Sequence, residues 1–132
     1  MSRRFMLDTD SVSFVLRAQG HVADQMARHA SDEICISAVT LAELRFGADL
    51  VHSSRLHTSI DRFVRNVVVQ PFDEICAKVY GAIASELQQR GSPIGKFDVL
   101  IAAHALTIDA TLVTNNVRHF ARVRGLRVEN WL

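Results

Sequence analysis

The chain lacks most of the features that assign a sequence to a class at first sight. Its 132 residues carry a formal net charge of +1, so the overall charge does not favour a nucleic-acid partner. No apolar stretch is long enough to span a membrane, and the first residues lack the hydrophobic segment of a signal peptide. No CxxC pair or His/Cys spacing indicates structural zinc. We therefore expect a cytoplasmic protein with no membrane partner.

Cysteine and lysine are both scarce. Cys35 lies in an apolar, strand-like run and Cys76 in a helical one, so two buried free thiols in a reducing compartment are favoured over a disulfide. The 15 basic residues include only two lysines, Lys78 and Lys96, and the other 13 are arginines. Because arginine contacts phosphate with two N–H groups and stacks on bases, this bias is compatible with an RNA partner.

Length and hydrophobic patterning indicate one α/β domain. Hydrophobic residues make up 48% of the chain, which is enough for an ordinary core. Apolar runs alternate with segments of helical period, which predicts an α/β/α sandwich with a mostly parallel central sheet. The predicted strands cover residues 4–8, 34–37, 67–69, 111–114 and 126–128. The predicted helices lie between residues 10 and 20, over 22–30, from 40 onward, and over 55–66, 73–90 and 98–107, with a loop at 115–120.

Three carboxylates stand at three of the predicted strand–helix junctions. Asp8 ends the first apolar run, Glu43 follows the second strand, and Asp98 opens a very apolar helix. In an open α/β sheet such positions converge in the crevice outside the strand ends, where ligands bind. Acids gathered there repel one another unless a cation neutralises them, and oxygen-only ligands suit a hard divalent ion such as Mg²⁺.

Each acid also has a purely structural interpretation. Asp8 or Asp10 could cap the following helix, and Thr40-x-x-Glu43 has the form of a capping box. Asp98 lies in a first helical turn, where acids favour the positive end of the helix. Three separate caps remain possible, but a single shared site explains all three positions at once.

Five stretches carry a resemblance to a known family. They are FMLDTD, ISAVTLAELRFGA, GSPIGKFDVLIAAHA, TLVTNNVRHF and the closing LRVENWL. The ordered set resembles the PIN-domain ribonucleases, and specifically the VapC toxins of bacterial toxin–antitoxin pairs, over essentially the whole chain. The resemblance implies a single PIN domain over residues 1–132 with a PIN-like α/β/α fold. It also implies that Asp8, Glu43 and Asp98 are catalytic, metal-binding residues.

The same resemblance implies a function and a set of partners. The expected activity is that of a metal-dependent endoribonuclease toxin of a type II toxin–antitoxin system, with Mg²⁺ or Mn²⁺ as cofactor. The expected substrate is tRNA, with initiator tRNA favoured by similarity to the toxins of enteric bacteria. The expected partners are a cognate VapB-type antitoxin and a second copy of the chain in a homodimer.

The chain departs from the family pattern after the fourth predicted strand. Asn116 stands where many relatives carry Asp, and His119 stands where others carry Asp or Glu, so a usual fourth acid is missing. Asp10 replaces a common Asn and could hold a metal-bound water. The residues expected to position water or phosphate are Thr9, Asp10, Thr114 and the catalytic-site Asn116, and those expected to contact RNA are Arg118 and Arg122.

Three further interpretations complete the expectations. His104, six residues into the apolar helix, is more typical of a satisfied buried histidine than of a base. A phosphoacceptor signalling domain also gathers acids at strand ends, but it needs a lysine near the last strand, where neither Lys78 nor Lys96 falls. A non-catalytic RNA- or partner-binding protein with a PIN fold is the alternative that the missing acid favours.

Overall fold

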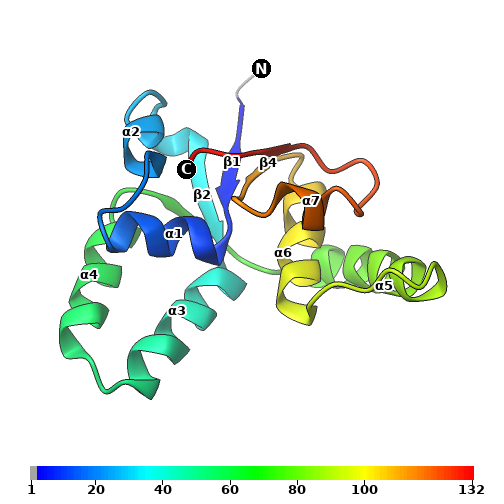
Figure 1. The fold of residues 1–132 in the computed structure, drawn as a ribbon, viewed down its shortest axis with the longest axis horizontal. Helices are drawn as coiled ribbons and strands as arrows, with labels where there is room; N and C mark the ends of the chain where they lie inside the picture. The colour runs from blue at the N-terminus through cyan, green and yellow to red at the C-terminus, as the bar shows by residue number, and fades with distance from the viewer. Residues whose placement is uncertain (1–2) are drawn as a thin grey trace.

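A five-stranded parallel sheet runs through the computed structural model, which describes residues 3–132 (Figure 1). Its strands are β1 (Phe5–Leu7), β2 (Ile34–Ser37), β3 (Val68–Gln70), β4 (Thr111–Val113) and β5 (Val128–Glu129). They lie in the order β3-β2-β1-β4-β5, and every neighbouring pair is parallel. The strand that begins the chain is therefore at the centre of the sheet.

Helices cover both faces of this sheet. They are α1 (Thr9–Leu16), α2 (Val22–Met26), α3 (Ala38–Leu50), α4 (Ser54–Val64), α5 (Glu74–Gln89), α6 (Lys96–Thr107) and α7 (Val117–Phe120), with a 3₁₀ turn at Ser31–Glu33. In Figure 1, α1 to α4 lie to the left of the sheet and α5 to α7 to the right. None of the helices in residues 3–132 combines the length and the hydropathy that a membrane span requires.

The alternation of strand side chains divides the core in two. Phe5 and Leu7 of β1 pack with side chains from α1 to α4, whereas Met6 packs with side chains from α5, α6 and α7. Ile36 and Cys35 of β2 divide between the two cores in the same way. Because β1 and β2 are buried on both faces, their sequences are continuous apolar runs.

The predicted α/β/α sandwich is confirmed, but three local predictions are wrong. Helix α3 begins at Ala38, because the Ser37 hydroxyl at the end of β2 accepts the N–H of Val39 at 3.0 Å and caps the helix. Thr40 therefore lies inside the first turn, and the capping box with Glu43 does not form. Residues 115–120 include the short helix α7 rather than only a loop, and the last strand is Val128–Glu129 rather than 126–128.

The thiols and the central histidine behave as expected from the sequence. Cys35 and Cys76 are buried and free, and burial raises the pKa of Cys35 to about 12, which keeps its thiol protonated. His104 is only 1% exposed, and its Nδ1 lies 2.8 Å from the Ser37 hydroxyl oxygen. Burial lowers the pKa of His104. It is a satisfied core histidine that ties α6 to the start of α3.

Ser37→Ala should destabilise the fold by about 2 kcal/mol, because it removes both a helix cap and the partner of a buried histidine, each worth about 1 kcal/mol. The matched control is Ser53→Ala, since the Ser53 hydroxyl caps α4 by accepting the N–H of Leu56 and makes no other hydrogen bond within residues 3–132. That control should lose only about 1 kcal/mol. Denaturant unfolding measures both, and equal losses would mean that His104 gains nothing from Ser37.

Candidate active site

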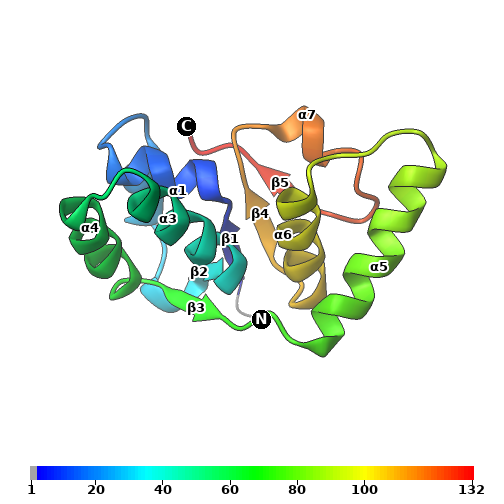
Figure 2. The same cartoon turned by 90° about the horizontal axis from the view of Figure 1, so that it is seen from below.

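The carboxyl ends of the strands bring four acids to one edge of the sheet. Asp8 directly follows β1, Asp10 lies in the first turn of α1, and Glu43 lies in the second turn of α3, the helix after β2. Asp98 comes from the first turn of α6. Figure 2, seen from below, shows α1 and α3 beginning beside the end of β1, with α6 alongside. Sequence segments that are far apart therefore meet where parallel strands end.

Asp8 is held in place as the N-cap of α1. Its Oδ1 accepts the N–H of Ser11 at 2.8 Å, and the Ser11 hydroxyl donates to the carbonyl of Val113 at 3.0 Å. The side chain is only 4% exposed, and this burial raises the pKa of Asp8, although hydrogen bonds from Thr114 and Ser11 lower it in part. Asp8 rather than Asp10 is thus the helix cap, and it is also a carboxylate kept away from water.

Glu43 faces α1 instead of capping its own helix. The Thr9 hydroxyl donates to Glu43 Oε1 at 2.5 Å, and the Thr9 and Thr40 hydroxyl oxygens lie 3.4 Å apart. Burial raises the pKa of Glu43, the Thr9 hydrogen bond lowers it, and repulsion from Asp98, Asp10 and Asp8 raises it further. The carboxylate therefore belongs electrostatically to the same pocket as the three aspartates.

Asp98 has a histidine as its immediate neighbour. The Nε2 atom of His119, on α7, lies 3.1 Å from Asp98 Oδ2. Burial raises the pKa of Asp98, His119 lowers it by charge and hydrogen bonding, and the charge of Asp10 raises it. His119 was singled out in the sequence only as a departure from a family pattern, and its contact with Asp98 was missed.

The charge of the exposed Asp10 acts on all three of the other acids. Its charge is among the causes that raise the pKa of Asp8, Glu43 and Asp98. Within residues 3–132, however, no three His, Cys, Asp or Glu side chains converge closely enough to form a ready-made set of metal ligands. Mg²⁺ keeps several waters and uses only one or two carboxylates directly, so oxygen donors spread around a pocket suit it. The donor chemistry therefore fits a hard divalent ion.

The remaining predicted residues differ in how they relate to this pocket. Thr114 is buried beside Asp8, and its hydroxyl oxygen accepts the N–H of Asn116 at 3.0 Å. Asn116 is exposed and precedes α7, with no capping bond from its side chain. Arg118 is exposed on α7, whereas Arg122 donates to the carbonyl of Pro93 at 3.2 Å. Part of the hydrogen-bonding capacity of Arg122 is thus used within the protein.

Thr40 is a second site residue that the sequence reasoning missed. It is fully buried, and its hydroxyl oxygen lies near that of Thr9, which in turn holds Glu43. The signal was present, since Thr40 follows β2 by three residues and precedes Glu43 by three. The capping-box interpretation of Thr40-x-x-Glu43 places its hydroxyl on the backbone of α3, whereas the structure places it beside Thr9.

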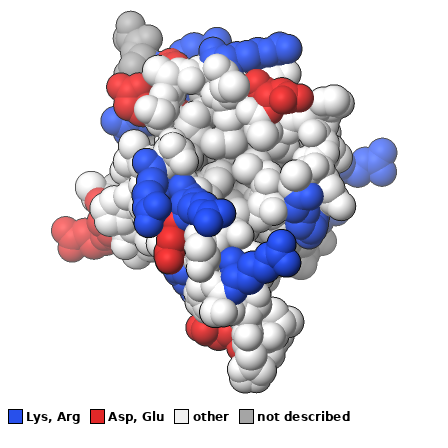
Figure 3. Space-filling model, turned by 90° about the vertical axis from the view of Figure 1, so that its left-hand side faces the viewer, with Lys and Arg blue, Asp and Glu red and all other residues white. Residues whose placement is uncertain are grey.

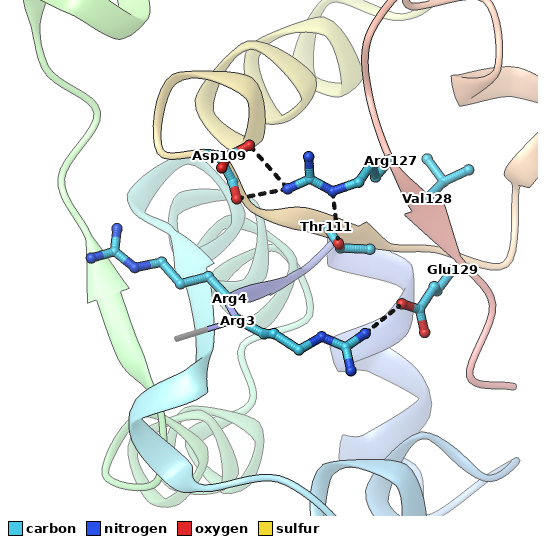
Figure 4. A pocket seen from close by; sticks show the side chains of 7 residues that line it. All are labelled: Arg3, Arg4, Asp109, Thr111, Arg127, Val128 and Glu129. Atoms are coloured by element: carbon cyan, nitrogen blue, oxygen red, sulfur yellow. Dashed lines mark hydrogen bonds and ion pairs between the residues drawn. The ribbon is translucent and has the colours of Figure 1, made fainter. Parts of the chain in front are cut away.

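A cavity of about 590 Å³ lies at the opposite, amino edge of the sheet (Figure 4). Its charged lining residues largely neutralise one another: Arg3 lies 3.9 Å from Glu129, and Arg127 lies 3.0 Å from Asp109. Figure 4 shows the Arg4 side chain extending away from these two pairs. Most charges in this cavity are paired, whereas the carboxylates of the acidic pocket repel one another. The acidic pocket is therefore the candidate active site.

The chain is similar to known proteins over nearly its whole length. The family model of the PIN domain matches residues 5–126. The chain is 37% identical to the tRNA(fMet)-specific endonuclease VapC of Shigella flexneri over 129 residues, covering 97% of this chain and 98% of that protein. It is 34% identical to a chain in the crystal structure of DNA-bound VapBC from Salmonella typhimurium, with a TM-score of 0.92 and coverage of 98% and 99%.

A further solved structure shares the fold at similar identity. A chain of VapBC2 from Rickettsia felis, bound to a DNA fragment from its promoter, is 33% identical with a TM-score of 0.88 and coverage of 97% and 98%. These matches establish the family. The chain belongs to the PIN domain family, among the VapC ribonucleases of toxin–antitoxin systems.

Proposed function

We propose that this protein is the toxin of a type II toxin–antitoxin pair and acts in the cytoplasm as a Mg²⁺- or Mn²⁺-dependent endoribonuclease. The observation that carries the proposal is the group of electrostatically coupled acids at the carboxyl edge of the sheet. The proposed substrate is tRNA, and initiator tRNA in particular, because two similar proteins carry the name tRNA(fMet)-specific endonuclease.

Asp8, Glu43 and Asp98 would hold the divalent ion, either directly or through waters. Such an ion neutralises charge on the attacked phosphate and lowers the pKa of water in its shell. The protein keeps the three carboxylates oriented toward the pocket: Ser11 binds Asp8, Thr9 binds Glu43, and His119 lies against Asp98. These hydrogen bonds fix the acids before substrate arrives, which reduces the cost of ordering them.

The reaction proposed is hydrolysis of one phosphodiester bond. A water oxygen forms a bond to phosphorus, the bond from phosphorus to the 3′ oxygen breaks, and the products carry a 5′-phosphate and a 3′-hydroxyl. Thr9, Thr114 and Asn116 would position water or phosphate by hydrogen bonding, with Asp10 at the exposed side of the pocket. Arg118 and Arg122 remain the proposed RNA contacts near α7.

The proposed partners are a VapB-type antitoxin and a second copy of the chain. Similar structures are VapBC complexes, and an antitoxin arginine placed against the acids would supply the charge that the metal otherwise supplies. Large apolar side chains are exposed on α3, at the residue that follows it, and on α5 and α6, which is the kind of surface that an oligomer covers. They are Phe46, Leu50, Val51, Ile75 and Phe97.

A non-catalytic RNA- or partner-binding protein is the second candidate. One observation favours it: the His119 ring lies within hydrogen-bonding distance of Asp98, at a place where the family usually has a fourth acid. Incubation of purified protein with tRNA and Mn²⁺, followed by sequencing of RNA 5′ ends, separates the two. Cleavage that stops on chelation supports the enzyme, whereas binding without cleavage supports the second candidate.

Asp8→Asn and Asp98→Asn should each reduce RNA cleavage by about 100-fold or more, since metal-linked charge stabilisation amounts to several kcal/mol and each 1.36 kcal/mol is tenfold in rate. Neither change should lower the melting temperature of the metal-free protein, because each removes repulsion from the pocket. Asp24→Asn, on an exposed residue of α2, is the matched control and should cleave normally. Full activity in Asp98→Asn would contradict the proposed site.

Glu43→Gln should abolish cleavage while leaving thermal stability unchanged. Glutamine can still accept the Thr9 hydroxyl, so the link between α1 and α3 survives, but the negative charge is lost. The control is Glu33→Gln, because that carboxylate accepts the N–H of Ala30 on the 3₁₀ turn away from the pocket. If the Glu43→Gln protein cleaves RNA like the wild type, Glu43 has only a structural role.

Asn116→Asp should strengthen Mn²⁺ binding by about tenfold, since the number of charged ligands tunes such sites over several orders of magnitude. It should also lower the melting temperature of the metal-free protein through added repulsion. Isothermal titration of Mn²⁺ measures the first effect, with Asn115→Asp on the neighbouring exposed residue as control. Identical stoichiometry and affinity in Asn116→Asp and wild type would mean that Asn116 does not face the ion.

A further inference from the structure

Two adjoining grooves lead away from the acidic pocket over α1 and α4. The first has a volume of about 240 Å³ and the second about 280 Å³. Leu16 lines both of them, and we call the pair the α1–α4 furrow. The first groove is lined by Thr9, Ser13, Leu16, Arg17, Glu43, Leu44, Gly47, Leu56 and Ile60. The second is lined by Val15, Leu16, Ser59, Arg62, Phe63 and Asn66.

The furrow includes one acid and two arginines. Glu43 of the active site lines the first groove, and the only other charged residues lining either groove are Arg17 and Arg62. Arg55 precedes Ser59 and Arg62 by four and seven residues on α4, which places it on the same helix face. Figure 3 looks onto this side of the molecule and shows blue side chains at several points, with fewer red ones and much uncharged surface between them.

These arginines are not neutralised by neighbouring carboxylates. Among residues 3–132, Arg17, Arg55 and Arg62 form no ion pair with an acidic side chain. The nearest acids on the α3–α4 hairpin have other partners, since Asp61 pairs with Arg45 at 2.5 Å and Asp49 lies 2.7 Å from His57. The positive charge of the furrow is therefore available to an external anion.

Charge also limits how the active site can hold RNA. The pocket carries several carboxylates, and the whole chain has a net charge of only +1, so neither attracts a polyanion. Binding of RNA then depends on local clusters of arginine that contact phosphates beyond the acids. The furrow supplies such a cluster in direct continuity with Glu43.

We propose that the α1–α4 furrow binds the RNA strand as it leaves the active site, with Arg17 and Arg62 contacting backbone phosphates. The inference rests on the proposed ribonuclease function and extends it to a substrate-binding surface. Ser59 and Asn66 line the second groove and offer hydrogen bonds to the sugar–phosphate backbone. The apolar floor, which includes the partly exposed Leu16 and Leu56, accommodates unstacked bases of a single-stranded segment.

The test measures RNA affinity and its salt dependence in an Asp98→Asn background, with a fluorescent 20-nucleotide single-stranded RNA and Mg²⁺. Arg17→Gln and Arg62→Gln should each weaken binding about fivefold and reduce the slope of log affinity against log salt by about 0.7. Arg17→Lys and Arg62→Lys, which keep the charge, should retain the slope. The matched controls are Arg3→Gln and Arg4→Gln, at the opposite edge of the sheet (Figure 4), and they should change neither quantity.

A kinetic measurement separates the furrow from the chemistry. With Asp98 intact, the Arg17→Gln/Arg62→Gln protein should show a raised KM for tRNA at unchanged kcat, and cleavage of a trinucleotide should be unaffected. If the wild type cleaves no RNA but the arginine variants still weaken binding, the proposed function fails and the furrow stands. If cleavage is present but affinity and salt slope are the same in variants and wild type, the furrow is wrong. Equal losses in the Arg3 and Arg4 controls, or loss of antitoxin binding alone, would also overturn it.

Discussion

Repulsion among carboxylates governs the carboxyl edge of the sheet. Asp8 is almost completely buried, and its charge acts together with those of Asp10 and Asp98 on Glu43.

The fold limits the cost of this repulsion by giving acids a hydrogen-bond donor of their own, from the backbone at Ser11, the hydroxyl of Thr9 or the ring of His119. These donors orient the acids but do not remove the excess negative charge, so the pocket is stabilised by any cation that enters it. The position of β1 at the centre of the sheet makes this arrangement possible, because α1 and α3, which follow β1 and its neighbour β2, and α6, which leads into its neighbour β4, all begin at this edge.

The same excess charge connects the three partners proposed for this protein. A divalent ion, an antitoxin arginine and a substrate phosphate with its ion each bring positive charge to the pocket or need it there. An inhibitor that carries its own cation therefore competes with catalysis by occupying the same electrostatic minimum. Substrate has the opposite problem, since its phosphates are repelled by the empty pocket. Arginines outside the pocket, free of internal ion pairs, are the physical means by which a nearly neutral protein can still bind RNA.

Much of the architecture could be predicted from the sequence, because buried parallel strands leave continuous apolar runs and acids after them stand out. The start of α3 could not be predicted, because Ser37 and Thr40 are both hydroxyl residues that could cap the helix. Only the position at which β2 ends decides between them. The segment from Thr40 to Glu43 has the same sequence whether Glu43 completes a capping box or faces the pocket. The hydrogen bond from Thr9 to Glu43 decides for the pocket. The four-residue helix α7 is too short to leave a periodic pattern. Local sequence likewise carries no signal for the contact of His119 with Asp98, which joins residues 21 positions apart.

The contact between His119 and Asp98 gives the departure from the family pattern a physical meaning. A fourth carboxylate at this place would add to the repulsion in the pocket and would provide another oxygen ligand for a metal. A histidine instead lies within hydrogen-bonding distance of Asp98 and lowers its pKa, so it relieves the repulsion from inside the protein. The metal-free pocket is thereby less destabilised, and the pocket that we propose to bind metal has fewer oxygen ligands for a second ion. Under the proposed function, the phosphate of the bound RNA becomes the natural source of the missing oxygen ligands, which couples metal occupancy to the presence of substrate.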